Sequence, residues 1–74
     1  MNLIEKPDFT PYEGCLGEWV PRAQFFSSNS KSFGYFQCNY CHKNWMSAFA
    51  RKNYKQGCKQ CDRYFLPVFM WINS

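Results

Sequence analysis

The stretch CNYCHKNWMSAFARKNYKQGCKQC, residues 38–61, contains two Cys-x-x-Cys pairs that are separated by sixteen residues. Two thiolates with this spacing can reach one cation from a tight backbone turn, and two such turns complete a tetrahedral site of four sulfurs. The spacing between the pairs is also typical of four-cysteine zinc sites. We therefore predict that Cys38, Cys41, Cys58 and Cys61 bind one structural Zn²⁺ ion.

Other roles for these residues are less well supported by the sequence. Neither pair is followed by a convincing amphipathic helix, and the chain is too short for a thioredoxin-like redox fold. His42 directly follows Cys41, and four thiolates leave it no coordination position, so we expect a surface residue or a neighbour of the ligands. Cys15 has no pair partner and is expected to be a small buried or partly exposed thiol. Because a four-thiolate site is closed, its metal should stabilise the fold and not catalyse a reaction.

The 74 residues allow one domain, and a core of that size needs additional support, which a metal can supply. Sixteen residues are Phe, Trp or Tyr, so the composition does not indicate disorder. Pro7 and Pro11 and mixed charges near the start predict an extended N-terminal arm over residues 1–16, held by Phe9 and Tyr12. Residues 17–74 should form a single zinc-binding domain.

The cysteine count and the apolar pattern bear on the compartment. Five cysteines and the absence of an apolar segment in residues 1–20 argue against a disulfide-bonded secreted protein. The longest apolar run covers residues 64–72 and is far shorter than the roughly 20 residues that cross a bilayer. We expect a reducing intracellular setting, the cytoplasm or its ribonucleoprotein granules, and no membrane contact.

Short apolar and aromatic segments around the cysteine pairs predict strands. GEWVPRAQFF (17–26) should contain an edge strand limited by Pro21, and SSNSKS (27–32) should be a polar loop. FGYFQ (33–37) and NWMSAFA (44–50) flank the first pair as strands, with Trp45 and Phe49 turned inward. A turn at 51–53, YKQG (54–57) and a last strand within YFLPVFMWI (64–72) complete the pattern. The fold class is thus a small, mostly β domain with an antiparallel zinc-ribbon-like sheet and two Cys-x-x-Cys knuckles.

The last segment is apolar on both sides, which requires cover on both faces of the strand. We expect the N-terminal segment to cover one side, so that most of residues 64–72 are core. If that cover is absent, the exposed part is a surface for a partner protein or for self-association.

The positive charge is concentrated in the cysteine-bearing part of the chain. Residues 1–22 have a balance of −2, whereas residues 31–63 have a balance of +6. Most charge runs are simply solvated surface, but here aromatic residues are interleaved with the cations, which favours a polyanionic partner. The candidate contacts to nucleic acid are Tyr40, Lys43, Arg51, Lys52, Lys55, Lys59 and Arg63.

The segments FGYFQCNYCHKNWMSAFA and YKQGCKQCDRYFLP resemble the three-CxxC zinc-finger family. That family includes the zygote arrest proteins of oocytes and the receptor-transporting proteins of chemosensory cells. The Gly-Tyr-Phe before the first pair and the Tyr-Lys-Gln before Cys58 are more similar to the zygote arrest branch. The resemblance spans residues 33 to about 67, although this sequence contains two Cys-x-x-Cys pairs and not three.

The resemblance implies a module that binds single-stranded RNA, in untranslated regions of messenger RNA, and regulates translation. Phosphates would be neutralised by the cations, and Tyr40, Trp45, Tyr54 or Tyr64 would stack on bases, with Trp45 more often a core residue. The alternative is a protein-interaction adaptor that uses the apolar C-terminal strand. We expect no enzyme and no small-molecule substrate, because no paired carboxylates, Ser/His/Asp group or open metal site is evident.

Overall fold

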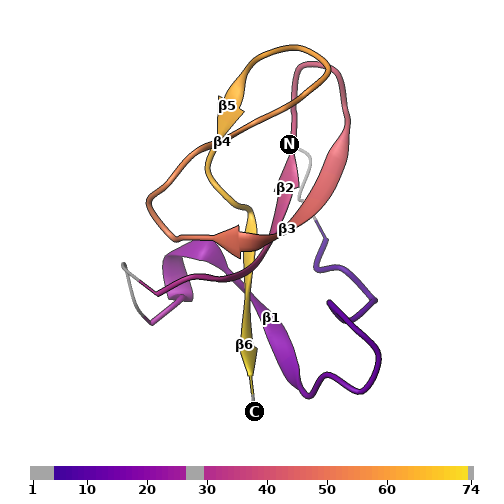
Figure 1. The fold of residues 1–74 in the computed structure, drawn as a ribbon, viewed down its shortest axis with the longest axis vertical. Helices are drawn as coiled ribbons and strands as arrows, with labels where there is room; N and C mark the ends of the chain where they lie inside the picture. The colour runs from indigo at the N-terminus through magenta and orange to yellow at the C-terminus, as the bar shows by residue number, and fades with distance from the viewer. Residues whose placement is uncertain (1–4, 27–29, 74) are drawn as a thin grey trace.

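The computed structural model describes residues 5–26 and 30–73 of the chain. Within these residues it contains six strands and one short 3-10 helix. They run in the order β1 (Gly17–Pro21), η1 (Arg22–Gln24), β2 (Ser32–Gln37), β3 (Asn44–Ala50), β4 (Gln56–Gly57), β5 (Tyr64–Phe65) and β6 (Phe69–Asn73) (Figure 1). This mostly β architecture, with the cysteine pairs between strands, confirms the predicted zinc-ribbon-like fold.

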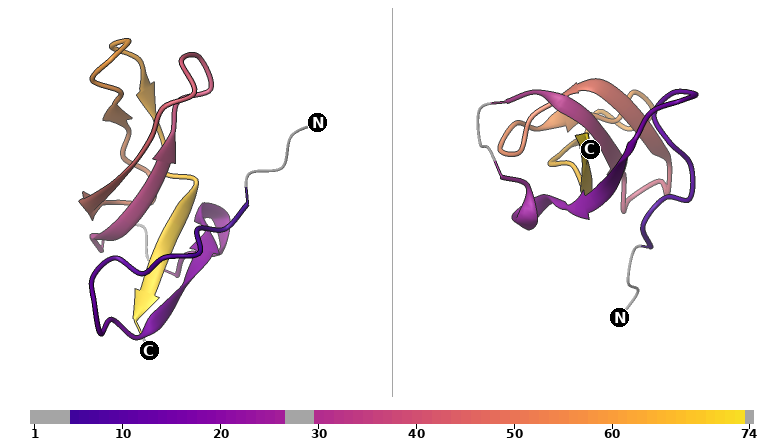
Figure 2. Two further views of the ribbon diagram at one scale, coloured as in Figure 1. Left: turned by 90° about the vertical axis from the view of Figure 1, so that its right-hand side faces the viewer. Right: turned by 90° about the horizontal axis from the view of Figure 1, so that it is seen from below.

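Four strands form an antiparallel sheet in the order β1–β6–β2–β3, and β4 pairs with β5 in a separate two-stranded sheet. The last strand is therefore central: Trp71 lies opposite Trp19 of β1, and Met70 lies opposite Gly34 of β2. β1 is an edge strand, which allows Pro21 at its end, as predicted. In Figure 2 the β4–β5 hairpin and the loop between β2 and β3 project from the same end of the main sheet.

A β-bulge in β3 turns Phe49 toward the solvent. Ser32 pairs with Ala50 and Gly34 pairs with Ser47, so two steps along β2 correspond to three steps along β3. The extra residue shifts the inward–outward alternation by one position. As a result Ala50 is fully buried, and Phe49 is 68% exposed. The prediction that Phe49 points inward is wrong for this reason.

Trp45 lies before the bulge and does turn inward, as predicted. Its ring stacks on that of Phe36, with 5.3 Å between the centroids and 5° between the planes. Phe36 is two residues before Cys38, and Trp45 is four residues after Cys41. The stacked pair therefore ties the first knuckle to the core.

Both faces of β6 are covered, so most of this apolar strand is core, as predicted. Phe69 and Trp71 pack with Cys15 and Trp19 in one buried cluster. Met70 faces the opposite side and belongs to a second cluster, whose other buried members are Phe25, Phe36 and Ala50. Cys15 is thus a small buried thiol within the first cluster.

The segment before β1 crosses the first cluster as an irregular chain with bends and one turn, in which the N–H of Cys15 donates to the carbonyl of Tyr12 (Figure 2). The carbonyl of Phe9 accepts a hydrogen bond from Nε1 of Trp19 at 2.8 Å, and the two rings meet edge to face. Tyr12 packs on Phe33, with 5.6 Å between the ring centroids. Phe9 and Tyr12 therefore hold the arm against the sheet, and the arm covers one side of the core.

The polar loop predicted for residues 27–32 falls partly outside the described residues, because the structure does not describe 27–29. Ser32 already belongs to β2. Among the described residues there is no helix with the length and hydropathy for a membrane crossing.

Candidate metal centre

The two Cys-x-x-Cys turns have the same backbone geometry. In the first knuckle, the N–H of Cys38 donates to the carbonyl of Lys43 at 2.7 Å, and the N–H of His42 donates to the carbonyl of Cys38 at 2.9 Å. In the second knuckle, the N–H of Cys58 donates to the carbonyl of Arg63 at 2.7 Å, and the N–H of Asp62 donates to the carbonyl of Cys58 at 2.9 Å. The equivalent bonds fold both turns so that their cysteines face the same point.

His42 and Asp62 occupy the same position, directly after the second cysteine of each pair. Both have a left-handed backbone, with φ of 63° and 57°. His and Asp are among the non-glycine residues that adopt this conformation more often than others. The exposed His42 therefore closes the turn, and within the described residues the group that could bind a metal consists of the four paired cysteines alone.

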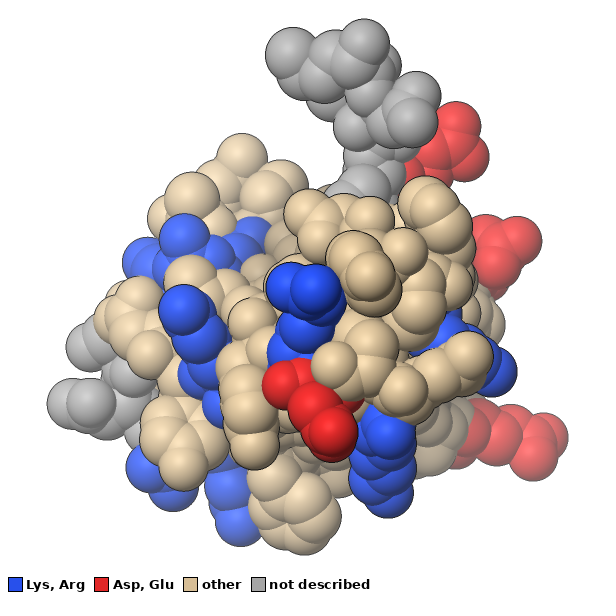
Figure 3. All heavy atoms as spheres, turned by 90° about the horizontal axis from the view of Figure 1, so that it is seen from above, with Lys and Arg blue, Asp and Glu red and all other residues tan. Residues whose placement is uncertain are grey.

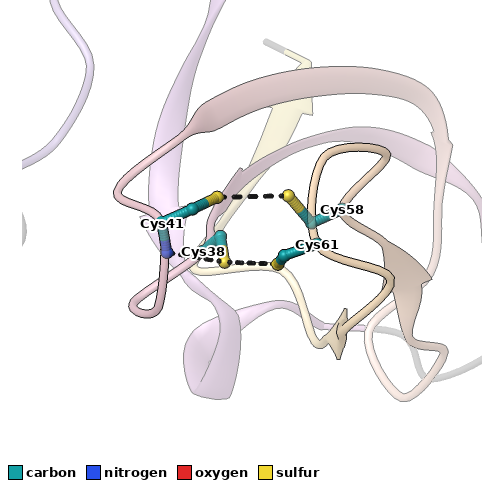
Figure 4. Close-up of side chains that lie close together, drawn as sticks. All are labelled: Cys38, Cys41, Cys58 and Cys61. Carbon is teal, nitrogen blue, oxygen red and sulfur yellow. Dashed lines mark hydrogen bonds between the residues drawn. The ribbon is translucent and has the colours of Figure 1, made fainter.

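The four sulfurs converge between the knuckles (Figure 4). Sγ of Cys38 lies 3.3 Å from Sγ of Cys61, Sγ of Cys41 lies 3.6 Å from Sγ of Cys58, and all four lie within 4.8 Å of one another. A tetrahedral zinc with Zn–S bonds of about 2.3 Å separates its sulfurs by about 3.8 Å. The cysteines therefore fit one Zn²⁺ ion, as predicted.

In the cluster the pKa values of two thiols, Cys38 and Cys58, are lowered, and those of the other two are raised. Burial acts to raise the pKa of Cys38, but the N–H of Cys41 and the thiol of Cys61 hold this pKa at about 6. Burial and the Cys38 sulfur raise the pKa of Cys61 to about 12. The pKa of Cys58 is lowered, against the effect of burial, by the N–H of Gln60 and the Cys41 thiol.

The remaining thiol, Cys41, has a raised pKa. The N–H of Lys43 opposes the rise, but burial and the sulfurs of Cys38 and Cys58 outweigh it. Cys41 and Cys61 therefore retain protons at neutral pH in the metal-free cluster, and a bound cation would replace these protons. All four positions of a tetrahedral ion would then be filled by sulfur, which leaves no open position for a substrate.

Two of the predicted nucleic-acid contacts bind each other across the site. The guanidinium of Arg63, in the second knuckle, lies over the ring of Tyr40, in the first knuckle, with 3.9 Å from Cζ to the centroid. Both residues are exposed. One face of Tyr40 is thus occupied, so Tyr40 and Arg63 form a cation–π bridge between the knuckles.

Lys52 does not lie on the outer basic face that the sequence predicted. Its ammonium donates to the carbonyls of Phe25, at 3.1 Å, and Ala23, at 3.4 Å, and its side chain is half-buried. The guanidinium of Arg22 donates in turn to the carbonyl of Lys52 at 3.2 Å. These bonds attach the turn after β3 to η1, so Lys52 has a structural role.

The other predicted cations, Lys43, Arg51, Lys55 and Lys59, are exposed. Seen from the end that carries the knuckles, Lys and Arg side chains are spread over the surface, and acidic side chains lie mostly toward one margin (Figure 3). This end of the molecule is therefore electropositive.

A groove of about 760 Å³ opens between the start of β3 and the second knuckle. Ammonium groups, amides and an indole contribute to its lining, through Lys43, Lys59, Asn44, Gln56, Gln60 and Trp45. The three amides could not be predicted from the sequence, because single Asn and Gln residues give no motif. The positions of His42 and Asp62 could have been recognised, since each follows a Cys-x-x-Cys pair.

Residues 30–74, more than half of the chain, match a family model that describes a zinc-binding domain of the 3CxxC zinc-ribbon type. No curated protein and no solved structure gives a significant match. The matched range includes both knuckles and the strands β2 to β6. The chain belongs to the 3CxxC-type zinc-ribbon family of zinc-binding domains.

Proposed function

We propose that this zinc-binding domain is a module for single-stranded RNA, with a role in post-transcriptional or translational regulation. The groove between β3 and the second knuckle carries the proposal, because its lining offers the three kinds of group that such RNA uses. Lys43 and Lys59 supply charge for phosphates, the amides of Asn44, Gln56 and Gln60 can bond base edges, and Trp45 supplies an aromatic surface.

The surroundings of the groove support the same partner. No acidic residue occurs between Lys31 and Cys61, and Arg51 and Lys55 add exposed positive charge near the groove. The resemblance to the zygote arrest branch, whose members bind untranslated regions of messages, also favours RNA. We propose that this chain is closer to that branch than to the receptor-transporting proteins.

The adaptor alternative depended on the apolar C-terminal stretch and on the acidic, proline-bearing arm, and the structure bears on the first of these. Phe69, Met70 and Trp71 are all buried in the two core clusters, so that strand offers little apolar surface to a partner. The described residues therefore favour RNA over the adaptor.

The test is a fluorescence-anisotropy titration of the zinc-loaded protein with labelled single-stranded RNA at about 50 and about 200 mM salt. Each phosphate contact to a single strand contributes about 0.7 to the slope of log K against log salt. The variant with Lys43→Gln and Lys59→Gln should therefore bind more weakly, with a slope reduced by about 1.4. Lys6→Gln, an exposed lysine in the arm, is the matched control and should bind like the wild type.

Two results would contradict the proposal. One is wild-type affinity and slope in a folded Lys43→Gln, Lys59→Gln variant. The other is displacement of RNA by poly-glutamate at equal charge concentration, because an acidic polypeptide would then satisfy the surface as well as RNA does.

A further inference from the structure

A second hollow, of about 350 Å³, is lined by Phe49, Arg51 and Tyr54. Phe49 is 68% exposed and Tyr54 is 65% exposed. Two large aromatic side chains beside one hollow provide flat surfaces on which a planar ligand can stack.

Hydrogen bonds order the backbone that carries both rings. At the bulge, the N–H of Phe49 donates to Oγ of Ser47 at 3.2 Å, and the carbonyl of Phe49 accepts from Nε2 of Gln56 at 3.2 Å. The N–H of Tyr54 donates to the carbonyl of Arg51 at 3.2 Å, which closes the turn after β3. Because the backbone at both rings is ordered before binding, stacking of a ligand on them requires less ordering of the protein chain.

The charge around the hollow is positive. Arg51 contributes to the lining, and Nζ of Lys31 lies over one face of the Phe49 ring, 4.9 Å from its centroid, so that the opposite face is the one on which a base can stack. No acidic residue occurs in the sequence between Lys31 and Cys61. Exposed rings next to cations match a nucleobase with its phosphate better than an uncharged apolar segment.

Gln56 links the groove to the hollow. It is one of the residues that line the groove, and its side-chain amide donates to the carbonyl of Phe49, a residue that lines the hollow. A strand of RNA that lies in the groove can therefore continue along β3 to the two rings.

We propose that the hollow is a second base-binding subsite, in which a nucleobase of the same single-stranded RNA stacks on Phe49 and Tyr54 while Arg51 and Lys31 contact its phosphate. This inference rests on the proposed RNA-binding function and extends it. The subsite lengthens the bound segment of RNA, so the affinity should increase when an oligonucleotide is long enough to occupy both the groove and the hollow.

The test compares single-stranded oligonucleotides of about four and about twelve nucleotides by fluorescence anisotropy with the zinc-loaded protein. Phe49→Ala and Tyr54→Ala should each weaken binding of the longer RNA about tenfold and leave binding of the shorter RNA unchanged. Phe26→Ala removes an aromatic ring that is 74% exposed and does not line the hollow, so it should bind both like the wild type. Zinc content and circular dichroism establish that each variant is folded.

The outcomes separate this inference from the proposed function. If the wild type binds RNA and both ring variants bind the longer RNA as tightly as the wild type does, the subsite is refuted and the RNA-binding function stands. If the variants lose both lengths equally, the rings belong to the primary site and the inference of a second subsite is overturned. If the wild type binds neither length, both proposals fail. If the ring variants bind poly-glutamate more weakly than the wild type does but bind the longer RNA as well as the wild type, the hollow is a site for an acidic protein segment and the inference is overturned.

Discussion

Arg63 and Tyr40 join the two zinc knuckles outside the cysteine cluster, with the guanidinium 3.9 Å from the centre of the ring. Arg63 supplies the carbonyl that accepts from Cys58, and Tyr40 lies between the cysteines of the first pair. The contact therefore joins a side chain of the second knuckle to a side chain of the first. The knuckles are held together by this bridge as well as by the metal ligands.

The bridge should contribute a measurable coupling energy. For an exposed cation–π pair we expect about 0.5–1 kcal/mol. A double-mutant cycle with Arg63→Gln and Tyr40→Leu, measured by denaturant unfolding of the zinc-loaded protein, should yield this value. Strictly additive effects of the two substitutions would show that the contact contributes nothing to stability.

Zinc affinity should fall as the pH falls, because zinc binds thiolates and competes with protons. Burial and the Cys38 sulfur hold the pKa of Cys61 at about 12, and the pKa of Cys41 is also raised, so binding at neutral pH releases at least the two protons of these thiols. Below about pH 6 the Cys38 thiolate is protonated as well, since its pKa is about 6, and the affinity should fall more steeply.

The measurement is a competition titration against a chromophoric chelator from about pH 5.5 to about pH 8, a range that includes the Cys38 pKa of about 6. We expect the logarithm of the affinity to rise by at least about two per pH unit above pH 6. An affinity that does not change over this range would contradict the assignment of protonated Cys41 and Cys61 thiols.

Gly34 lies in β2 beside the end of β3, where the neighbouring side chains leave no room for a larger residue. A Cβ at this position would collide with the Cβ of Ala50 and lie 3.2 Å from Cε1 of Phe36. Gly34→Ala should therefore destabilise the protein by about 1–3 kcal/mol, as overpacking of a core does. Thermal unfolding measures the loss, and Ala50→Gly in the same chain should recover part of it. Equal stability of Gly34→Ala and the wild type would show that the strands separate at little cost.

Substitutions of His42 should change the stability through the backbone conformation that they allow, because His42 is not a metal ligand. Its φ of 63° suits glycine, and a β-branched residue is strained there. His42→Val should be less stable than His42→Gly by about 1–2 kcal/mol, and both should retain zinc. Loss of zinc from a folded His42→Gly variant would instead indicate that His42 is a ligand.

The knuckles could be predicted from the sequence because their determinants are local. Two cysteines three residues apart and a left-handed residue after the second one define each turn. The pairing of β1 with β6, which joins Gly17 to Asn73, depends on contacts between distant parts of the chain. No local pattern in the sequence specifies that register.

The inward placement of Phe49 was predicted from strict alternation, which a single inserted residue reverses. Lys52 was counted as a surface cation, because its partners, the carbonyls of Ala23 and Phe25, lie more than 25 positions away in the sequence. Phe49 was expected inside because it is apolar, but it is exposed, and Lys52 was expected on the surface because it is charged, but it is half-buried. In both cases the tertiary structure decides the position. The groove was missed because it forms between β3 and the second knuckle, which no motif connects.

The central claim is that one zinc ion, bound by Cys38, Cys41, Cys58 and Cys61, holds the two knuckles together. Metal binding by such sites is worth about 10–16 kcal/mol, which exceeds the few kcal/mol that a core of this size supplies. Removal of zinc with a chelator should therefore abolish the cooperative thermal transition, and zinc should restore it.

Native mass spectrometry, combined with thermal unfolding of the same samples, tests this claim most directly. We predict one zinc ion per chain in the wild type and in Cys15→Ser, whose thiol lies in the core away from the cluster. Cys61→Ser should lose the ion or bind it far more weakly, and its thermal transition should disappear with the metal. A second zinc ion in the wild type, or a fully loaded and equally stable Cys61→Ser variant, would contradict the claim.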